Sequence, residues 1–231
     1  EYRNIFKMPS VKKFKSASMY CKGALEMEPE TSAIEHIVLR ETYIVKEAVQ
    51  PLIRSCKALK TFHVTSDYNH HGRLFTPYDA VEALRQHLST LEELTILKYS
   101  EIDCRAPGLL PHEVYIGTAL RGFENLKTLN CEMENLLGII PGLPHLNYQH
   151  SDLVDSLPMS IENLTILKVD EQIIPYLQKL EDVTAQRFPK LRQVRISLLE
   201  NSVDKILRLQ IEMLEVILLD DPRSIDAVYD I

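Results

Sequence analysis

Histidines, cysteines and acidic residues are the side chains of this sequence that could do chemistry, and their spacing indicates none. Residues 112–116 (HEVYI) contain the His-Glu pair of a zinc-protease helix but lack its second histidine. His145 and His150 form another possible metal pair, yet two loop histidines without a third ligand are more typical of solvated side chains. The sequence has no phosphate-binding glycine loop and no nucleophile-elbow motif. We therefore expect no metal, no cofactor and no enzymatic activity, with a hydrolase that carries its catalytic residues on loops as a minor alternative.

Charge and cysteine content argue against several classes of protein. The 231 residues carry a net charge of −7, which disfavours nucleic-acid binding because phosphate contact requires a concentrated basic surface. No apolar run reaches the roughly 18 residues of a membrane helix. Four widely spaced cysteines predict reduced thiols in an intracellular protein, cytoplasmic or nuclear. The charge is uneven, since residues 1–23 are basic and residues 200–231 are acidic, and such polarity can orient a partner.

A repeated pattern carries most of the information about the fold. Residues 91–98 (LEELTILK) and 161–168 (IENLTILK) agree at six of eight positions, and residues 59–64 (LKTFHV) and 126–131 (LKTLNC) share their first three residues. All four segments read apolar-x-x-apolar-x-apolar, and the same frame fits segments that begin at residues 11, 34, 191 and 211. The last two apolar residues of each frame are two positions apart, so they point to the same side of a short strand.

Helical patterns separate the predicted strands. Apolar residues recur at helical spacing within residues 44–53, 81–91, 115–123 and 173–183. Thr76 and Pro77 supply a capping residue and a first-turn proline for the second of these helices. Pro51 is expected to kink or restart the first helix, whereas Pro175 fits only in a first turn. The alternation predicts an α/β solenoid over residues 1–231, with parallel strands on the concave face and helices on the convex face, in seven or eight irregular repeats.

The strand positions between the apolar ones are predicted to face solvent and to form a protein-binding concave surface. These positions are Lys13, Lys15, His36, Val38, Arg40, His63, Thr65, Glu93, Thr95, Leu97, Asn130, Glu132, Asn163, Thr165, Leu167, Gln193 and Arg195. Solvent exposure predicts that truncating a threonine of this set to alanine costs less than about 0.5 kcal/mol. Three of the positions are aliphatic, which indicates either a contact patch or a one-residue error in the frame. The insertions at residues 67–76 and 99–112 are further candidates for contacts.

Over about residues 5–219 the pattern resembles leucine-rich repeats of the long, irregular kind. Residues 7–14 (KMPSVKKF) and 157–164 (LPMSIENL) are similar to the segments that lead into strands in F-box/leucine-rich-repeat proteins of filamentous fungi. The resemblance implies that the chain recognises a protein substrate for a ubiquitin ligase. It also implies contact with the cullin-ligase adaptor through an N-terminal F-box that this chain does not contain, so we expect a fragment of a longer protein. A repeat scaffold or adaptor unrelated to ubiquitylation is the alternative.

Overall fold

The computed structural model describes most of the chain. The described residues are 2–21, 23–66, 75–98, 114–140, 152–198 and 215–219. Several candidates from the sequence lie outside them, namely Cys104, residues 112 and 113, His145, His150 and most of the insertions at 67–76 and 99–112.

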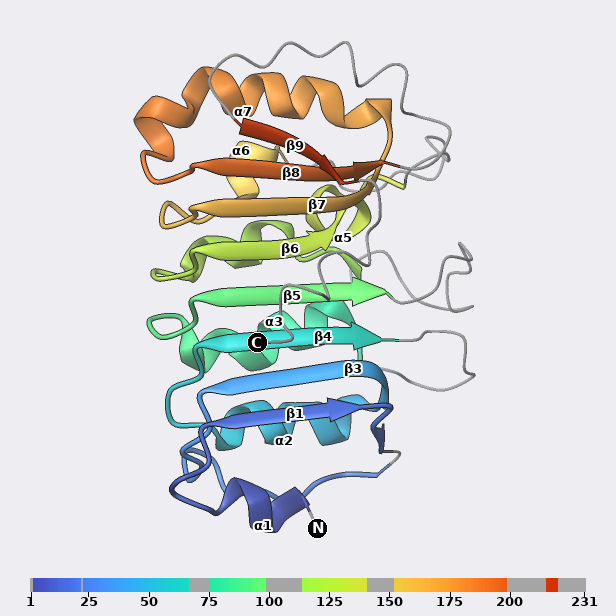
Figure 1. Ribbon diagram of the computed structural model, residues 1–231, viewed down its shortest axis with the longest axis vertical. Helices are drawn as coiled ribbons and strands as arrows, with labels where there is room; N and C mark the ends of the chain where they lie inside the picture. Colours follow the sequence, from blue (N-terminus) through green and yellow to red (C-terminus); the bar gives the residue numbers. More distant parts are fainter. Residues whose placement is uncertain are drawn as a thin grey trace.

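Parallel strands stacked in chain order form the main layer of the molecule (Figure 1). Within the described ranges the sheet order is β1-β3-β4-β5-β6-β7-β8-β9, and the two-residue strand β2 also pairs with β3. The bounds are β1 Lys13–Ala17, β2 Tyr20–Cys21, β3 His36–Ile44, β4 Thr61–Ser66, β5 Glu93–Lys98, β6 Thr128–Glu132, β7 Asn163–Val169, β8 Gln193–Leu198 and β9 Glu215–Leu219. Every pairing is parallel. The predicted side-by-side parallel strands are therefore confirmed.

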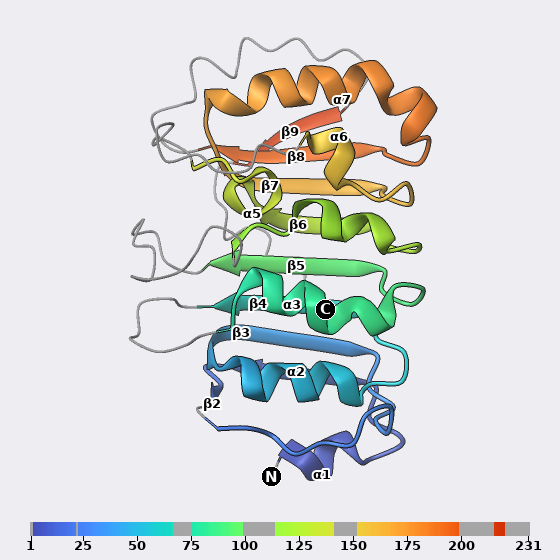
Figure 2. The same ribbon diagram turned by 180° about the vertical axis from the view of Figure 1, so that it is seen from behind.

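Helices connect the strands and cover one side of the sheet. The α-helices are α1 Tyr2–Phe6, α2 Lys46–Ser55, α3 Pro77–Leu84, α5 Met133–Leu137, α6 Leu153–Ser156 and α7 Ile174–Arg187, and the 3₁₀ helices are η1 Arg85–His87, η2 Gly117–Gly122 and η4 Glu171–Ile173. Figure 2 shows α2, α3, α6 and α7 on the same side of the sheet. The predicted α/β solenoid arrangement, with strands on one face and helices on the other, is confirmed.

The apolar positions of the repeat form the core between sheet and helices. Leu94 pairs in register with Leu129, which pairs with Leu164, and all three are fully buried. A parallel sheet aligns equivalent side chains in rows, and neighbours within a row lie about 4.8 Å apart on adjacent strands. Each row therefore buries one apolar residue per repeat against the helices. This row is the reason that the two similar octets recur in the sequence.

Local sequence accounts for several of the helix boundaries. Thr76 caps α3, because its hydroxyl accepts from the backbone N–H of Asp79 at 3.1 Å while the Asp79 carboxylate accepts from the backbone N–H of Thr76. Pro175 lies in the first turn of α7, as predicted. The stripe at residues 115–123 forms only a short 3₁₀ helix with a glycine at each end, since glycine has low helix propensity.

Pro51 does not restart α2, which runs unbroken from Lys46 to Ser55, so the prediction of a restart was wrong. A proline deprives the carbonyl four residues earlier of its helical donor. In α2 that carbonyl belongs to Glu47, and it accepts the backbone N–H of Leu25 at 3.2 Å instead. A loop from the preceding repeat thus satisfies the carbonyl that Pro51 leaves open, and the helix continues to Ser55.

Candidate protein-interaction surface

The strand residues that alternate with the core residues point away from the helices, and we call this side of the sheet the helix-free face. In-register pairing arranges its side chains in rows across the strands. The first row is Lys13, His36, Thr61, Glu93, Thr128, Asn163 and Gln193. The second row is Lys15, Val38, His63, Thr95, Asn130, Thr165 and Arg195. The residues predicted to share one face are therefore brought together.

Solvent exposure on the helix-free face is far more restricted than the sequence predicted. Lys13 and Lys15 are exposed, and six further candidates are partly buried, namely His36, Arg40, Glu93, Asn163, Gln193 and Arg195. The other nine predicted contact residues are buried, which corrects the expectation that they face solvent: Val38, His63, Thr65, Thr95, Leu97, Asn130, Glu132, Thr165 and Leu167. Thr95 and Thr165 are only 2% and 3% exposed.

Packing along the rows contributes to this burial. Each side chain in the middle of the sheet has neighbours on both flanking strands about 4.8 Å away. Hydrogen bonds join neighbours within the face: the Asn130 amide donates to the Thr95 hydroxyl at 2.8 Å, and His63 Nε2 lies 3.1 Å from the Thr65 hydroxyl. Polar side chains that satisfy one another in this way can leave water at little cost. Sequence periodicity places such residues on a face but does not determine their exposure.

The three aliphatic residues of the face decide between the two interpretations of the sequence, which were an exposed contact patch and a one-residue error in the strand frame. Val38 pairs in register with His63, Leu97 with Thr65, and Leu167 with Glu132. All three aliphatic residues are buried, yet none belongs to the core cluster under the helices. The frame was therefore correct, and the expectation of an exposed aliphatic patch was wrong.

Burial on this face changes the acid–base behaviour of one histidine. His63 is 1% exposed, and burial lowers its pKa from 6.5 to about 4, with a smaller contribution from the positive charge of Arg40. Both effects disfavour the imidazolium form. His63 is therefore neutral at pH 7 and acts as a polar packing residue.

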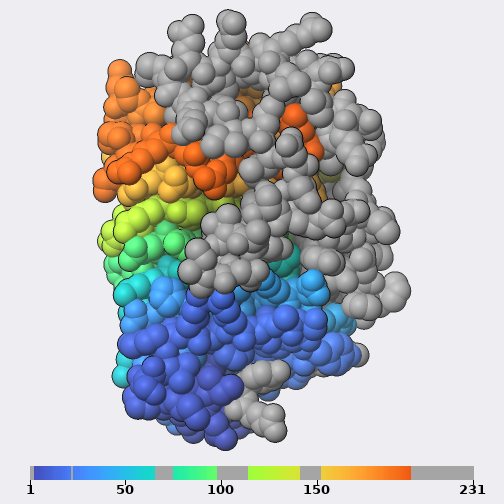
Figure 3. Space-filling model, in the orientation of Figure 1, coloured from blue at the N-terminus to red at the C-terminus, as the bar shows by residue number. Residues whose placement is uncertain are grey.

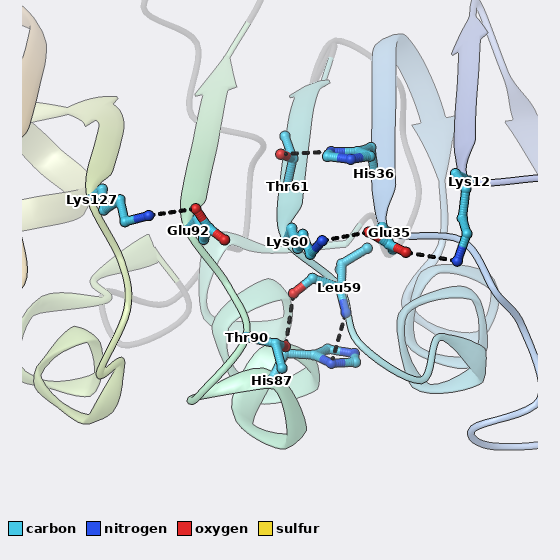
Figure 4. A network of polar contacts seen from close by, with 10 residues as sticks. All are labelled: Lys12, Glu35, His36, Leu59, Lys60, Thr61, His87, Thr90, Glu92 and Lys127. Atoms are coloured by element: carbon cyan, nitrogen blue, oxygen red, sulfur yellow. Dashed lines mark hydrogen bonds and ion pairs between the residues drawn. The ribbon is translucent and has the colours of Figure 1, made fainter.

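Just before β1 and just before each strand from β3 to β8, a row of charged residues of alternating sign crosses the repeats, and we call it the charge ladder. Its members are Lys12, Glu35, Lys60, Glu92, Lys127, Glu162 and Arg192. Each member donates its backbone N–H to the carbonyl of the preceding member at 2.7–2.8 Å, so the ladder positions are structurally equivalent. Figure 4 shows the first five with their side-chain contacts.

Ion pairs connect successive members of the charge ladder. The Glu35 carboxylate contacts Lys12 Nζ at 2.7 Å and Lys60 Nζ at 2.6 Å, and Lys127 Nζ contacts Glu92 at 2.7 Å. Hydrogen bonds from Lys12 and then Lys60 lower the pKa of Glu35 to about 2. The pKa of Lys60 is raised chiefly by Glu35, and the Glu92 charge adds to this effect. Opposite charges thus support one another over several repeats, although exposed pairs each contribute little stability.

Sequence reasoning missed the charge ladder. Its members occupy the second position of every apolar-x-x-apolar-x-apolar frame, directly before the first-row residues. Superposing the seven frames from residues 11 to 191 and reading the sign of charge at that position would have revealed the alternation.

A family model described as a leucine-rich repeat domain matches residues 3–215 of the chain. This chain belongs to the leucine-rich repeat family. A search of curated proteins and a search of solved structures give no match. The match spans all the strands from β1 to β8, and the ladder and the rows of the helix-free face are thus features of a leucine-rich repeat sheet.

A chain of hydrogen bonds crosses three strands of this leucine-rich repeat protein. His36 Nδ1 lies 3.0 Å from the Thr61 hydroxyl, which in turn donates to the Glu93 carboxylate at 3.3 Å. A threonine hydroxyl has a single proton. With that proton directed to Glu93, the ring nitrogen of His36 must be the donor to Thr61. The histidine is then not placed to activate the hydroxyl as a nucleophile, and the arrangement favours a structural link between strands over catalysis.

The described residues include neither a metal-ligand cluster nor a membrane-spanning helix. Among the described residues no group of three His, Cys, Asp or Glu side chains is arranged to hold a metal ion. Within the same ranges, no helix is long and apolar enough to cross a bilayer.

The aromatic residue Tyr20 is 60% exposed and stacks on Tyr43 with ring centroids 4.9 Å apart. The strand pattern of the sequence did not indicate this contact.

Proposed function

We propose that this leucine-rich repeat chain is a non-enzymatic protein-interaction module. The observation that carries the proposal is the parallel sheet itself, which presents its helix-free face as rows of polar side chains in register. Repeat sheets of this type are extended and rigid, so a partner meets preformed positions and little ordering is needed on binding.

The partly accessible residues define where contact is made. We assign the first-row residues His36, Glu93, Asn163 and Gln193, together with Arg195, as contact positions in the body of the sheet. The second-row neighbours of His36, Glu93 and Asn163, which are Val38, Thr95 and Thr165, are buried. The exposed Tyr20, stacked on Tyr43, is an additional anchor because exposed aromatic residues are enriched among residues that dominate binding.

The more specific proposal is that the partner is a protein substrate of a ubiquitin ligase. Support comes from the resemblance of residues 7–14 and 157–164 to strand-leading segments of F-box/leucine-rich-repeat proteins. In this proposal the chain works inside the cell, and an F-box in an upstream segment contacts the cullin-ligase adaptor. The alternative is a leucine-rich repeat scaffold without an F-box.

Affinity purification of the full-length protein tests this specific proposal. Recovery of a cullin-ligase adaptor, together with ubiquitylation of a co-purified protein, supports the substrate-receptor role. Recovery of stable partners without the adaptor favours the scaffold.

The contact surface is tested with a purified partner from the same experiment. The double substitution Glu93→Arg/Gln193→Glu alters two first-row positions of the helix-free face and is expected to weaken binding at least tenfold. The matched control, Asp182→Arg/Gln186→Glu, makes the same change in net charge at two exposed positions of α7 on the opposite side. Equal affinity of the two variants, with both folded, would place the contact elsewhere.

A further inference from the structure

Access to the helix-free face is concentrated at its N-terminal end. Lys13 and Lys15 on β1 are exposed, and His36 and Arg40 on β3 are partly exposed. From β4 to β7 the second row is nearly inaccessible, with 1% exposure at His63 and 2–4% at its three successors. In the space-filling view of this face, the blue surface of the first residues is open at the lower end (Figure 3). A partner approaching the face therefore meets β1 and β3 first.

This accessible end is strongly basic. The outward residues of β1 and the regular part of β3 are Lys13, Lys15, Ala17, His36, Val38 and Arg40, with three cations and no acid among them. Of the nearby acids, Glu35 already binds Lys12 and Lys60, and Glu41 lies at the register shift between Leu39 and Thr42, outside the regular rows. Burial lowers the pKa of His63 and the charge of Arg40 adds to this effect, so the charge of Arg40 acts on a side chain of the next strand.

We propose that the β1–β3 end of the helix-free face binds an extended acidic segment of a partner protein, with the carboxylates of alternate residues on Lys13 and Lys15. This proposal deepens the protein-interaction function above and rests on it. Side chains two residues apart on a strand are separated by about 6.7 Å. An extended peptide has the same spacing between alternate side chains, so two acidic residues separated by one residue match the two lysines of β1.

A protein segment fits this surface better than a nucleic acid. The basic area is only two strands wide, and the chain as a whole has a net charge of −7, which repels a long phosphate backbone. Buried Val38 lies between the Lys15 and His63 positions and gives the surface an apolar floor. Short acidic peptides can use such a mixed surface without extending over the acidic remainder of the molecule.

The test measures binding of a fluorescent peptide with alternating Glu and Ser by anisotropy. The controls are a Gln-Ser peptide of equal length and an oligonucleotide of equal charge. We expect the Glu-Ser peptide to bind, the Gln-Ser peptide to bind at least tenfold more weakly, and affinity to fall between about 50 and 300 mM salt because ion pairs are screened. Lys13→Glu/Lys15→Glu should weaken Glu-Ser binding at least tenfold, and Lys13→Gln/Lys15→Gln should weaken it by a smaller factor.

A control variant with the same change in net charge shows whether the loss of peptide binding is specific to Lys13 and Lys15. Lys57→Glu/Lys190→Glu alters two exposed lysines that precede β4 and β8 on the sequence and lie outside the rows. It should retain peptide affinity within about twofold. Equal losses in both charge-reversal variants, or absence of binding by the unaltered protein, would overturn the proposal. Preferential binding of the oligonucleotide would also overturn it. These peptide results do not depend on partner capture, so the general interaction function and this acidic-segment site can fail separately.

Discussion

The buried imidazole of His63 predicts that the protein loses stability as pH falls below neutrality. The pKa of His63 is about 4 in the folded chain, whereas the ordinary histidine value is 6.5. Between these values the unfolded chain binds a proton that the folded chain excludes. Because the unfolded state then holds more protons, the free energy of unfolding rises with pH in this window and falls as pH decreases.

The two pKa values set the size of this loss in the free energy of unfolding. Full proton exclusion over the interval from 6.5 to about 4 corresponds to an upper limit of about 3 kcal/mol. Between pH 7.5 and pH 5, before the folded-state group titrates, the expected loss is about 2 kcal/mol. Glu35 contributes little in this interval, since its pKa is lowered to about 2 and its stabilising effect is lost mainly as pH falls from the ordinary value of 4.5 towards 2.

A second histidine, His87, adds to the pH dependence of the free energy of unfolding. His87 Nδ1 accepts the backbone N–H of Leu59 at 3.4 Å, and its Nε2 lies 3.1 Å from the carbonyl of Ile53 (Figure 4 shows the Leu59 contact). Burial lowers the pKa of His87, although the Ile53 carbonyl opposes this shift. Protonation of Nδ1 would remove the acceptor of the Leu59 N–H. In the wild type, the free energy of unfolding should therefore change more steeply with pH than His63 alone would cause.

The assay is urea unfolding at pH 7.5, 6.5, 5.5 and 5.0, followed by circular dichroism. His63→Gln keeps a polar side chain without a titrating ring, and its loss of stability between pH 7.5 and pH 5 should be about 2 kcal/mol smaller than that of the wild type. His36→Gln removes a partly exposed imidazole on the adjacent strand and serves as the matched control. If wild type and His63→Gln lose the same stability over this range, His63 is not held neutral by the fold and the assignment fails.

Three further predictions concern the core, the helix-free face and the ladder. Leu94→Ala should lower the free energy of unfolding by about 2–5 kcal/mol in urea titrations, since this fully buried residue packs in the central row. Thr95→Ala should cost about 1–3 kcal/mol, because the buried Asn130 amide loses its acceptor; a loss under about 0.5 kcal/mol would restore the solvent-facing interpretation. Glu35→Lys should lower the melting temperature at low salt, because it places three cations in succession on the ladder. The double variant Glu35→Lys/Lys60→Glu should recover part of this loss in melting temperature. High salt should reduce the difference between these two variants.

Features determined by local sequence could be predicted, whereas features determined by contacts between repeats could not. The frame around Leu94 identified a strand correctly because a period of two is a property of the segment itself. The cap at Thr76 was equally local. By contrast, the tolerance of Pro51 depends on a backbone donor from Leu25 in another repeat. The burial of Thr95 depends on Asn130, 35 residues later, and periodicity contains no information on such neighbours.

The charge ladder shows how repeats with nearly identical apolar frames can be kept in order. Residues 91–98 and 161–168 are so similar that core packing alone hardly distinguishes β5 from β7. A slip by one repeat would place like charges side by side along the ladder. Correct stacking instead places opposite charges side by side, and four of the six steps form ion pairs. Specificity depends on this difference between correct and incorrect arrangements, so ion pairs of little absolute strength can still select the order. A slip by two repeats preserves both the sign of charge and the apolar frame, as Glu92 and Glu162 illustrate. The unequal connections between strands must therefore discriminate against that arrangement, which gives the irregular repeat lengths a physical role.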